Sequence, residues 1–113
     1  MQYFTWHLAG GLTASTSQQH SYVTVGDLRP LLINLYAKTA PGSNAPLTLD
    51  INDDGVSIFT FLPNMWTRGP VRFRGVFVDA RILEGSVLTL DIDQVGSPES
   101  GRDLTVQLVC EEF

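Results

Sequence analysis

The stretch LTLDINDDGVSIFTF, residues 47–61, decides the fold class because it contains two strand-like runs joined by a tight turn. From residue 47 to residue 52, apolar and polar residues alternate, which places one set of side chains on a core and the other in water. The dipeptide Asp54-Gly55 follows, and it tolerates the positive φ angles that a two-residue hairpin turn needs. The stretch therefore predicts an antiparallel β-hairpin.

The same alternation recurs along the rest of the chain, at residues 4–8, 31–37, 88–93 and 104–110. No segment carries apolar residues at helical spacing behind a capping residue, and Gly and Pro interrupt the chain at short intervals. Short strands separated by such turns are typical of an all-β fold. We predict an antiparallel β-sandwich, jelly-roll or immunoglobulin-like, with about seven to eight strands. The pentapeptide LTLDI, at 47–51 and again at 88–92, indicates two strands with equivalent roles.

Between residues 71 and 82 the alternation changes phase. Val71 and Phe73 share one side, whereas after Gly75 the apolar side is carried by Val76, Val78, Ala80 and Ile82. A one-residue change of parity would turn a strand inside out. We therefore expect a β-bulge or a sharp bend at Arg74-Gly75.

The chain has 113 residues, which fits a single domain. We divide it into an N-terminal strand and a Ser/Thr/Gln-rich arm at 1–25, a candidate docking segment, and a β-sandwich at 26–113. The first residues lack the pattern of a signal peptide, and no apolar run reaches the length of a membrane span. We therefore expect synthesis in a cytoplasm without export.

The composition argues against two classes of partner. The net charge is −5 and Lys38 is the only lysine, whereas nucleic-acid binding needs clustered basic residues. An anionic membrane surface is disfavoured for the same reason. Cys110 is the only cysteine, so it forms no intrachain disulfide, and its place in an alternating run predicts a small buried apolar side chain.

Several residues invite a chemical reading. Asp50, Asn52 and Asp54 match the first half of a calcium loop, but its twelfth position is Phe61 and no helix flanks it, so the hairpin is favoured over a metal site. Asp50, Asp91 and Asp93 lie on polar strand faces, and glycoside hydrolysis would need a convergent pair beside a cleft. His7 and His20 lack metal-ligand spacing. We predict that the protein has no catalytic residues, binds no cofactor and is not an enzyme.

Two segments carry residue types that are enriched at interfaces. The loop at 62–69 holds Met65, Trp66 and Arg68. Trp66 has three alternative roles: a plug for one end of the sandwich, a protein contact, or a sugar-stacking platform. The N-terminal strand holds Tyr3, Phe4 and Trp6, which we interpret as an edge strand that pairs with a neighbour.

Four ordered segments, at residues 40–47, 50–59, 84–97 and 101–106, suggest a family. Together they resemble a β-sandwich module found in the tail, fibre and head-decoration proteins of tailed bacteriophages. The resemblance covers roughly residues 28–109, and DINDDGVSIF and LTLDIDQVGS are its most specific parts. It implies a fold-making role for the motif residues and transfers no catalytic group.

The resemblance implies a structural component of a virion, made as a late protein and assembled in the host cytoplasm. Its expected partners are other virion proteins and further copies of the chain, for instance in a homotrimer. The alternative is a carbohydrate-binding module that attaches to a host glycan, in which Trp66 or Tyr36 would be exposed for ring stacking.

Overall fold

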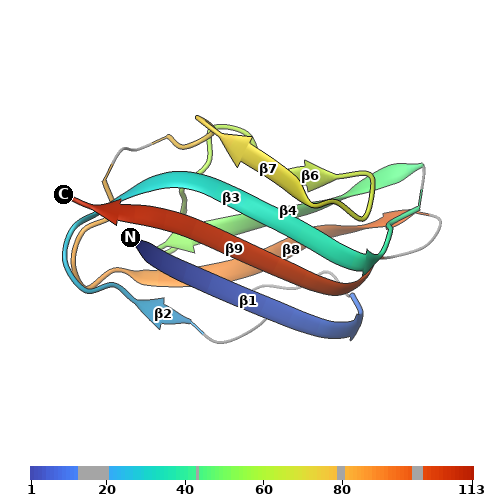
Figure 1. Ribbon diagram of the computed structural model, residues 1–113, viewed down its shortest axis with the longest axis horizontal. Helices are drawn as coiled ribbons and strands as arrows, with labels where there is room; N and C mark the ends of the chain where they lie inside the picture. Colours follow the sequence, from blue (N-terminus) through green and yellow to red (C-terminus); the bar gives the residue numbers. More distant parts are fainter. Residues whose placement is uncertain (13–20, 43, 79–80, 98–100) are drawn as a thin grey trace.

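The computed structural model describes residues 1–12, 21–42, 44–78, 81–97 and 101–113. Its strands form two antiparallel sheets, one of which lies in front of the other in Figure 1. The strands are β1 (Gln2–Gly11), β2 (Tyr22–Val23), β3 (Leu28–Thr39), β4 (Ala45–Asp53), β5 (Val56–Ser57), β6 (Asn64–Met65), β7 (Val71–Arg74), β8 (Val87–Ser97) and β9 (Arg102–Glu112). Among the described residues there is no helix long and apolar enough to cross a membrane.

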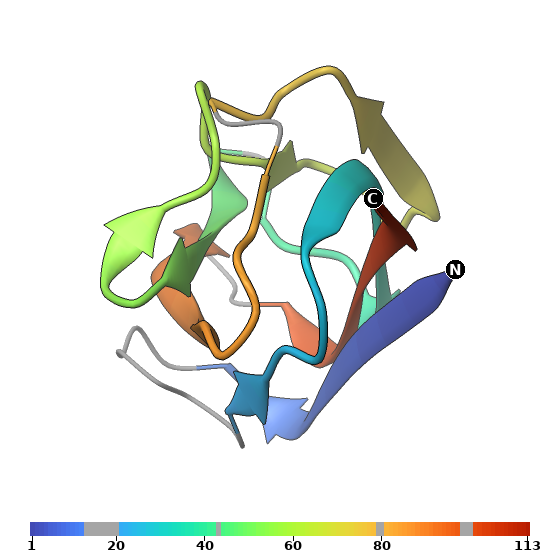
Figure 2. The ribbon, with the colours of Figure 1, turned by 90° about the vertical axis from the view of Figure 1, so that its left-hand side faces the viewer.

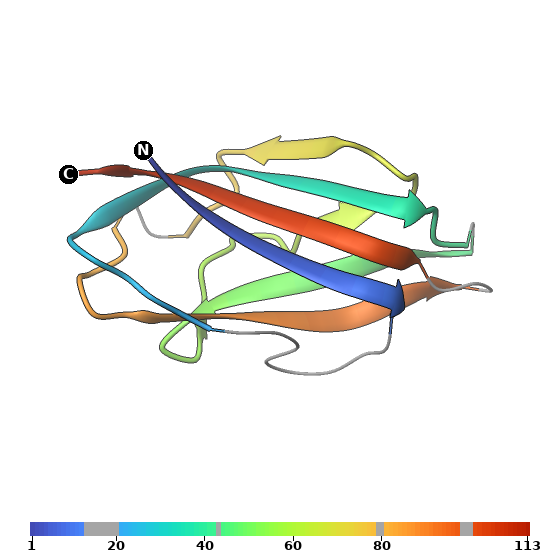
Figure 3. The same ribbon diagram turned by 60° about the horizontal axis from the view of Figure 1, so that its bottom comes forward.

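The strand order identifies the type of sandwich. Sheet A has the order β1-β9-β3-β7, and sheet B has the order β2-β8-β4-β5, with β6 also paired to β4. Most successive strands cross from one sheet to the other, so the chain winds around the core (Figures 2 and 3). This order, in which the chain passes from one sheet to the other between most successive strands, is that of a jelly roll. The predicted β-sandwich is confirmed, and of the two predicted types the topology is the jelly roll.

The core lies between the sheets and is built by the alternation read from the sequence. Trp6, Ile33 and Leu108 project inward from sheet A, and Ile51 and Leu90 project inward from sheet B; all five are at most 1% exposed. Cys110 is also fully buried, as predicted. Burying such side chains stabilises the fold by roughly 1.5–3 kcal/mol each.

The hairpin at residues 47–61 and its turn are confirmed. Asp54 and Gly55 have φ angles of 49° and 87°, which join β4 to β5 through two residues with positive φ. The second strand is shorter than predicted, since β5 ends at Ser57 and only an isolated bridge pairs Phe59 with Phe77. The two LTLDI segments are neighbours, because β4 and β8 pair antiparallel through them.

The sharp bend predicted at Arg74-Gly75 is confirmed, but the apolar alternation after it forms no continuous strand among the described residues. The chain bends sharply there, with a Gly75 φ angle of 68°, and β7 ends at Arg74. Beyond the bend, Phe77 and Ile82 make isolated bridges to different partners, and Val78 is 58% exposed; Ala80 lies outside the described residues. The segment leaves the edge of sheet A and leads to β8 in sheet B, so it does not follow one sheet long enough to form a strand.

Candidate interaction surface

The structure corrects the predicted role of the N-terminal aromatic residues. Phe4 is 6% exposed and Trp6 is fully buried, and both pack edge-on against the ring of Tyr22 at 5.2 Å between ring centroids. The Tyr22 hydroxyl also donates a hydrogen bond of 2.6 Å to the backbone oxygen of Thr5. β1 is an edge strand of this chain's own sheet A, and of its three aromatic side chains only that of Tyr3, at 60% exposed, is available to a partner. Residues 13–20 of the predicted arm, which include His20, lie outside the described residues.

Of the three interface candidates in the loop at 62–69, one side chain is buried and two are exposed. β6 pairs Met65 with Leu47, and the Met65 side chain is 1% exposed in the core. Trp66 is 51% exposed and does not plug the end of the sandwich. Arg68 is also exposed, and its backbone oxygen accepts a hydrogen bond of 2.8 Å from the amide of Ala37 in β3. The segment after β6 therefore leads from sheet B to β7 of sheet A and is hydrogen-bonded to β3 on the way.

The outward-facing side chains of sheet A form an ordered surface, which we call the sheet A face. Strand register places them in three rows across the sheet. The rows are Tyr3–Val109–Leu32–Arg74, then Thr5–Gln107–Asn34–Arg72, then His7–Thr105–Tyr36. The two tyrosines and two arginines belong to the residue types that dominate binding energy at interfaces.

Hydrogen bonds hold the middle of the sheet A face in place. Arg72 donates from Nε to Asn34 Oδ1 at 2.8 Å, and Asn34 donates from Nδ2 to Gln107 Oε1 at 3.1 Å. In the next row, His7 Nδ1 and Thr105 Oγ1 share a hydrogen bond of 3.0 Å. Side chains already fixed in this way lose less conformational entropy when a partner binds.

Sequence reasoning missed most of this face. Arg72, Arg74, Asn34 and Gln107 all stand at polar positions of alternating runs, which is a signal for exposure only. Their proximity depends on β3 lying between β7 and β9, strands that are distant from one another along the chain.

The outward side of sheet B, the sheet B face, carries a group of carboxylates. Asp50 lies directly opposite Asp91 in the β4–β8 ladder, and Asp93 is close enough to interact with Asp50. Asp50 accepts a hydrogen bond of 2.6 Å from Ser57 Oγ, and Asp91 accepts one of 2.6 Å from Asn52 Nδ2. Partial burial, followed by the nearby charges of Asp93 and Asp91, raises the pKa of Asp50.

The residues of the calcium half-motif make other contacts. Asn52 is bonded to Asp91, and Asp54 Oδ1 accepts a hydrogen bond of 2.9 Å from the backbone amide of Val87. Within the described part of the chain, no cluster of three or more His, Cys, Asp or Glu is placed to hold a metal ion.

One cavity lies beside the β4–β5 hairpin and not over the carboxylate group. It encloses about 120 Å³, and it is lined by Asp53, Val56, Ser57, Ile58, Val78, Arg81 and Ile82. Ligand pockets commonly measure roughly 300–1,000 Å³. Asp50 and Asp91 lie opposite each other, as glycoside hydrolysis would require of its two carboxylates. Neither of them lines this cavity, so the cavity is not a substrate cleft for that pair.

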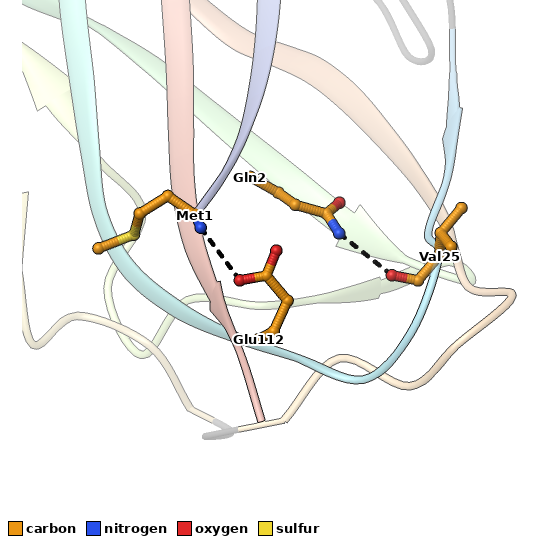
Figure 4. Close-up of polar contacts among 4 residues, drawn as sticks. All are labelled: Met1, Gln2, Val25 and Glu112. Atoms are coloured by element: carbon orange, nitrogen blue, oxygen red, sulfur yellow. Dashed lines mark hydrogen bonds and ion pairs between the residues drawn. The ribbon is translucent and has the colours of Figure 1, made fainter.

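Both ends of the chain meet at one end of the sandwich (Figure 4). The Met1 ammonium lies 3.0 Å from Glu112 Oε2, and this hydrogen bond lowers the pKa of the Glu112 carboxyl. Gln2 Nε2 donates to the backbone oxygen of Val25 at 3.2 Å. Nearby, the guanidinium groups of Arg29 and Arg81 lie 4.7 and 4.3 Å from the centre of the Phe113 ring. These contacts hold β1, β9 and the β2–β3 connection together.

Comparison with known proteins finds no match: no family model, no curated protein and no solved structure is significantly similar to this chain.

Proposed function

We propose that this protein is a non-enzymatic structural component of a bacteriophage virion, acting in capsid decoration or in a tail or fibre through protein–protein assembly. The observation that carries the proposal is the sheet A face, where exposed Tyr3, Tyr36, Arg72 and Arg74 surround a hydrogen-bonded amide network. Such a surface suits a flat protein contact. The jelly roll, an architecture of viral capsid domains, is compatible with this role but is shared by unrelated functions.

The test is whether the sheet A face places the protein in particles. Purified particles are analysed by quantitative mass spectrometry, and the labelled protein is located in them by electron microscopy. Tyr36→Ala with Arg72→Ala should lower the copy number per particle at least about tenfold, since each such truncation at an interface centre costs about 2 kcal/mol.

Phe61→Ala is the matched control, because Phe61 is 75% exposed and lies outside the sheet A face. It should leave the copy number unchanged. Normal incorporation of the double variant would remove the sheet A face from the proposal. Recovery of the parent protein only in host cytosol would overturn the virion role itself.

A second candidate function is glycan binding for host-surface attachment. It is favoured by the exposure of both predicted stacking residues, Tyr36 at 41% and Trp66 at 51%. Aromatic faces beside amide and guanidinium donors suit sugar rings and their hydroxyl groups. A panel of host-surface polysaccharides, probed with the parent protein and with Trp66→Ala and Tyr36→Ala, tests this role. Binding that either substitution abolishes would support it, and a panel without binding would contradict it.

A further inference from the structure

Charged residues are divided unequally between the two sheets. The strands of sheet A contain Arg29, Lys38, Arg72, Arg74 and Arg102, which are five of the seven Lys and Arg residues of the chain. The strands of sheet B contain no Lys or Arg, and they contain Asp50, Asp53, Asp91 and Asp93. In a chain of net charge −5, one side of the sandwich is therefore locally basic and the other is acidic.

The basic groups of the sheet A face are not neutralised by the chain's own carboxylates. Among the described residues, no ion pair involves Arg72 or Arg74 of this face, or Lys38 near the end of β3. β9 does carry carboxylates, but they lie toward its ends and are engaged there. Glu111 pairs with Arg29 at 3.1 Å, and Asp103 accepts a hydrogen bond of 2.6 Å from the Gly10 amide.

The sheet B face has the opposite character. Asp50 and Asp91 are direct cross-strand partners, and like charges in that position destabilise a sheet. Asp93 adds a third, exposed carboxylate nearby. A cationic surface laid over these groups would relieve their repulsion, and the two arginines of the sheet A face supply one.

The two faces are also large enough to form an interface. They lie on opposite sides of the sandwich (Figure 2), and the two longer dimensions of the molecule are 41 and 24 Å. The rectangle that encloses one face therefore measures roughly 980 Å², which is an upper limit for the area of the face. A standard protein–protein interface buries about 800 Å² per partner.

We propose that copies of this chain stack head to tail, with the sheet A face of one copy on the sheet B face of the next, so that Arg72 and Arg74 meet Asp91 and Asp93. This inference rests on the proposed assembly function, and it names the partner as a second copy of the chain. The contact is heterologous: it joins two different surfaces of the same protein. It gives a closed ring, such as a trimer, if the rotation between copies closes, and an open filament if it does not.

The experiment compares two full-length variants, each with one face neutralised, by sedimentation velocity. R72Q with R74Q alters the sheet A face, and D91N with D93N alters the sheet B face. The parent protein should self-associate at about 0.02 M salt and dissociate at about 0.5 M, because salt screens exposed charges. Each variant alone should be monomeric, its association at least about tenfold weaker.

An equimolar mixture of the two variants distinguishes this geometry from others. Each variant retains the face that the other lacks, so the mixture should form a one-to-one complex and nothing larger. R68Q with R102Q removes two basic groups outside the three rows of the sheet A face and should associate like the parent. E84Q is the corresponding acidic control, and thermal melts followed by circular dichroism establish that every variant is folded.

The stacking would be overturned by a mixture that stays monomeric, by variants that each assemble like the parent, or by assembly that depends on only one of the faces. The last would indicate a symmetric contact. A protein that is present in particles but monomeric in solution at all concentrations would contradict stacking and leave the proposed function intact. A protein that stacks in solution but is absent from particles would overturn the proposed function and leave the stacking.

Discussion

At the scale of single residues, Asp50 shows how the fold retains an unfavourable charge. Its carboxylate is partly buried beside Asp93 and opposite Asp91, and its pKa is raised for these reasons. Because the folded-state pKa lies above the unfolded value, the ionised group destabilises the fold at neutral pH. This destabilisation disappears as the pH falls through the folded-state pKa.

Asp50→Asn should therefore raise the free energy of unfolding at neutral pH by a few tenths to about 1 kcal/mol. Asparagine keeps an oxygen that accepts the hydrogen bond from Ser57 and removes the charge. The difference from the parent should shrink as the pH is lowered, as measured by urea unfolding at several pH values. Glu84→Gln, an exposed carboxylate outside the sheets, is the control; a D50N variant less stable than the parent at neutral pH would contradict the account.

Cys110 is a second residue whose environment determines its chemistry. Burial, with a smaller effect from the charge of Glu112, raises its pKa to about 12. Since the thiolate is the reactive form, the native thiol should not react with a disulfide reagent near neutral pH and should react once the protein is denatured. Absorbance of the released thiol product measures this, and exposed Tyr36→Cys provides the reactive control. Rapid labelling of native Cys110 would show that β9 opens.

At the scale of elements, the end of β6 places two successive side chains in opposite environments, one in the core and one in solvent. Met65 is in the core, while Trp66 is half exposed. Met65→Ala should lower the free energy of unfolding by about 2–5 kcal/mol, because it leaves a cavity. Trp66→Ala should lower it by less than about 1 kcal/mol. Urea unfolding measures both, and equal losses would mean that Trp66 is a core residue after all.

At the scale of the whole molecule, β1 is part of the sandwich and not an appendage. Trp6→Ala should lower the free energy of unfolding by about 3–5 kcal/mol, a large share of the roughly 5–15 kcal/mol that stabilises a domain. Deletion of residues 1–25 should accordingly unfold the protein, so loss of particle incorporation in that deletion would not identify a docking arm. Circular dichroism and thermal melting measure both effects, with Tyr3→Ala as the folded control. Cooperative melting of residues 26–113 alone would contradict this view.

Local sequence patterns predict much of the fold but little of the candidate interaction surface. The hairpin at Asp54-Gly55 and the burial of Cys110 follow from local patterns and were predicted. The apolar alternation after Gly75 does not form a strand, and the sequence could not show this, because alternation within a segment does not reveal whether a partner strand runs beside it. Phe4 and Trp6 were assigned to an interface because residue type alone does not tell a core aromatic from an exposed one.

The sequence by itself determined which side chains of each strand face the core, because a period of two is a property of a few consecutive residues. Only the tertiary structure decided which strands are neighbours. Asn34 meets Arg72 and Gln107 across 38 and 73 residues of chain, and Asp50 meets Asp91 through two copies of one pentapeptide. These meetings depend on the packing of two whole sheets around a shared core, and the basic and acidic faces exist only because that packing places them on opposite sides.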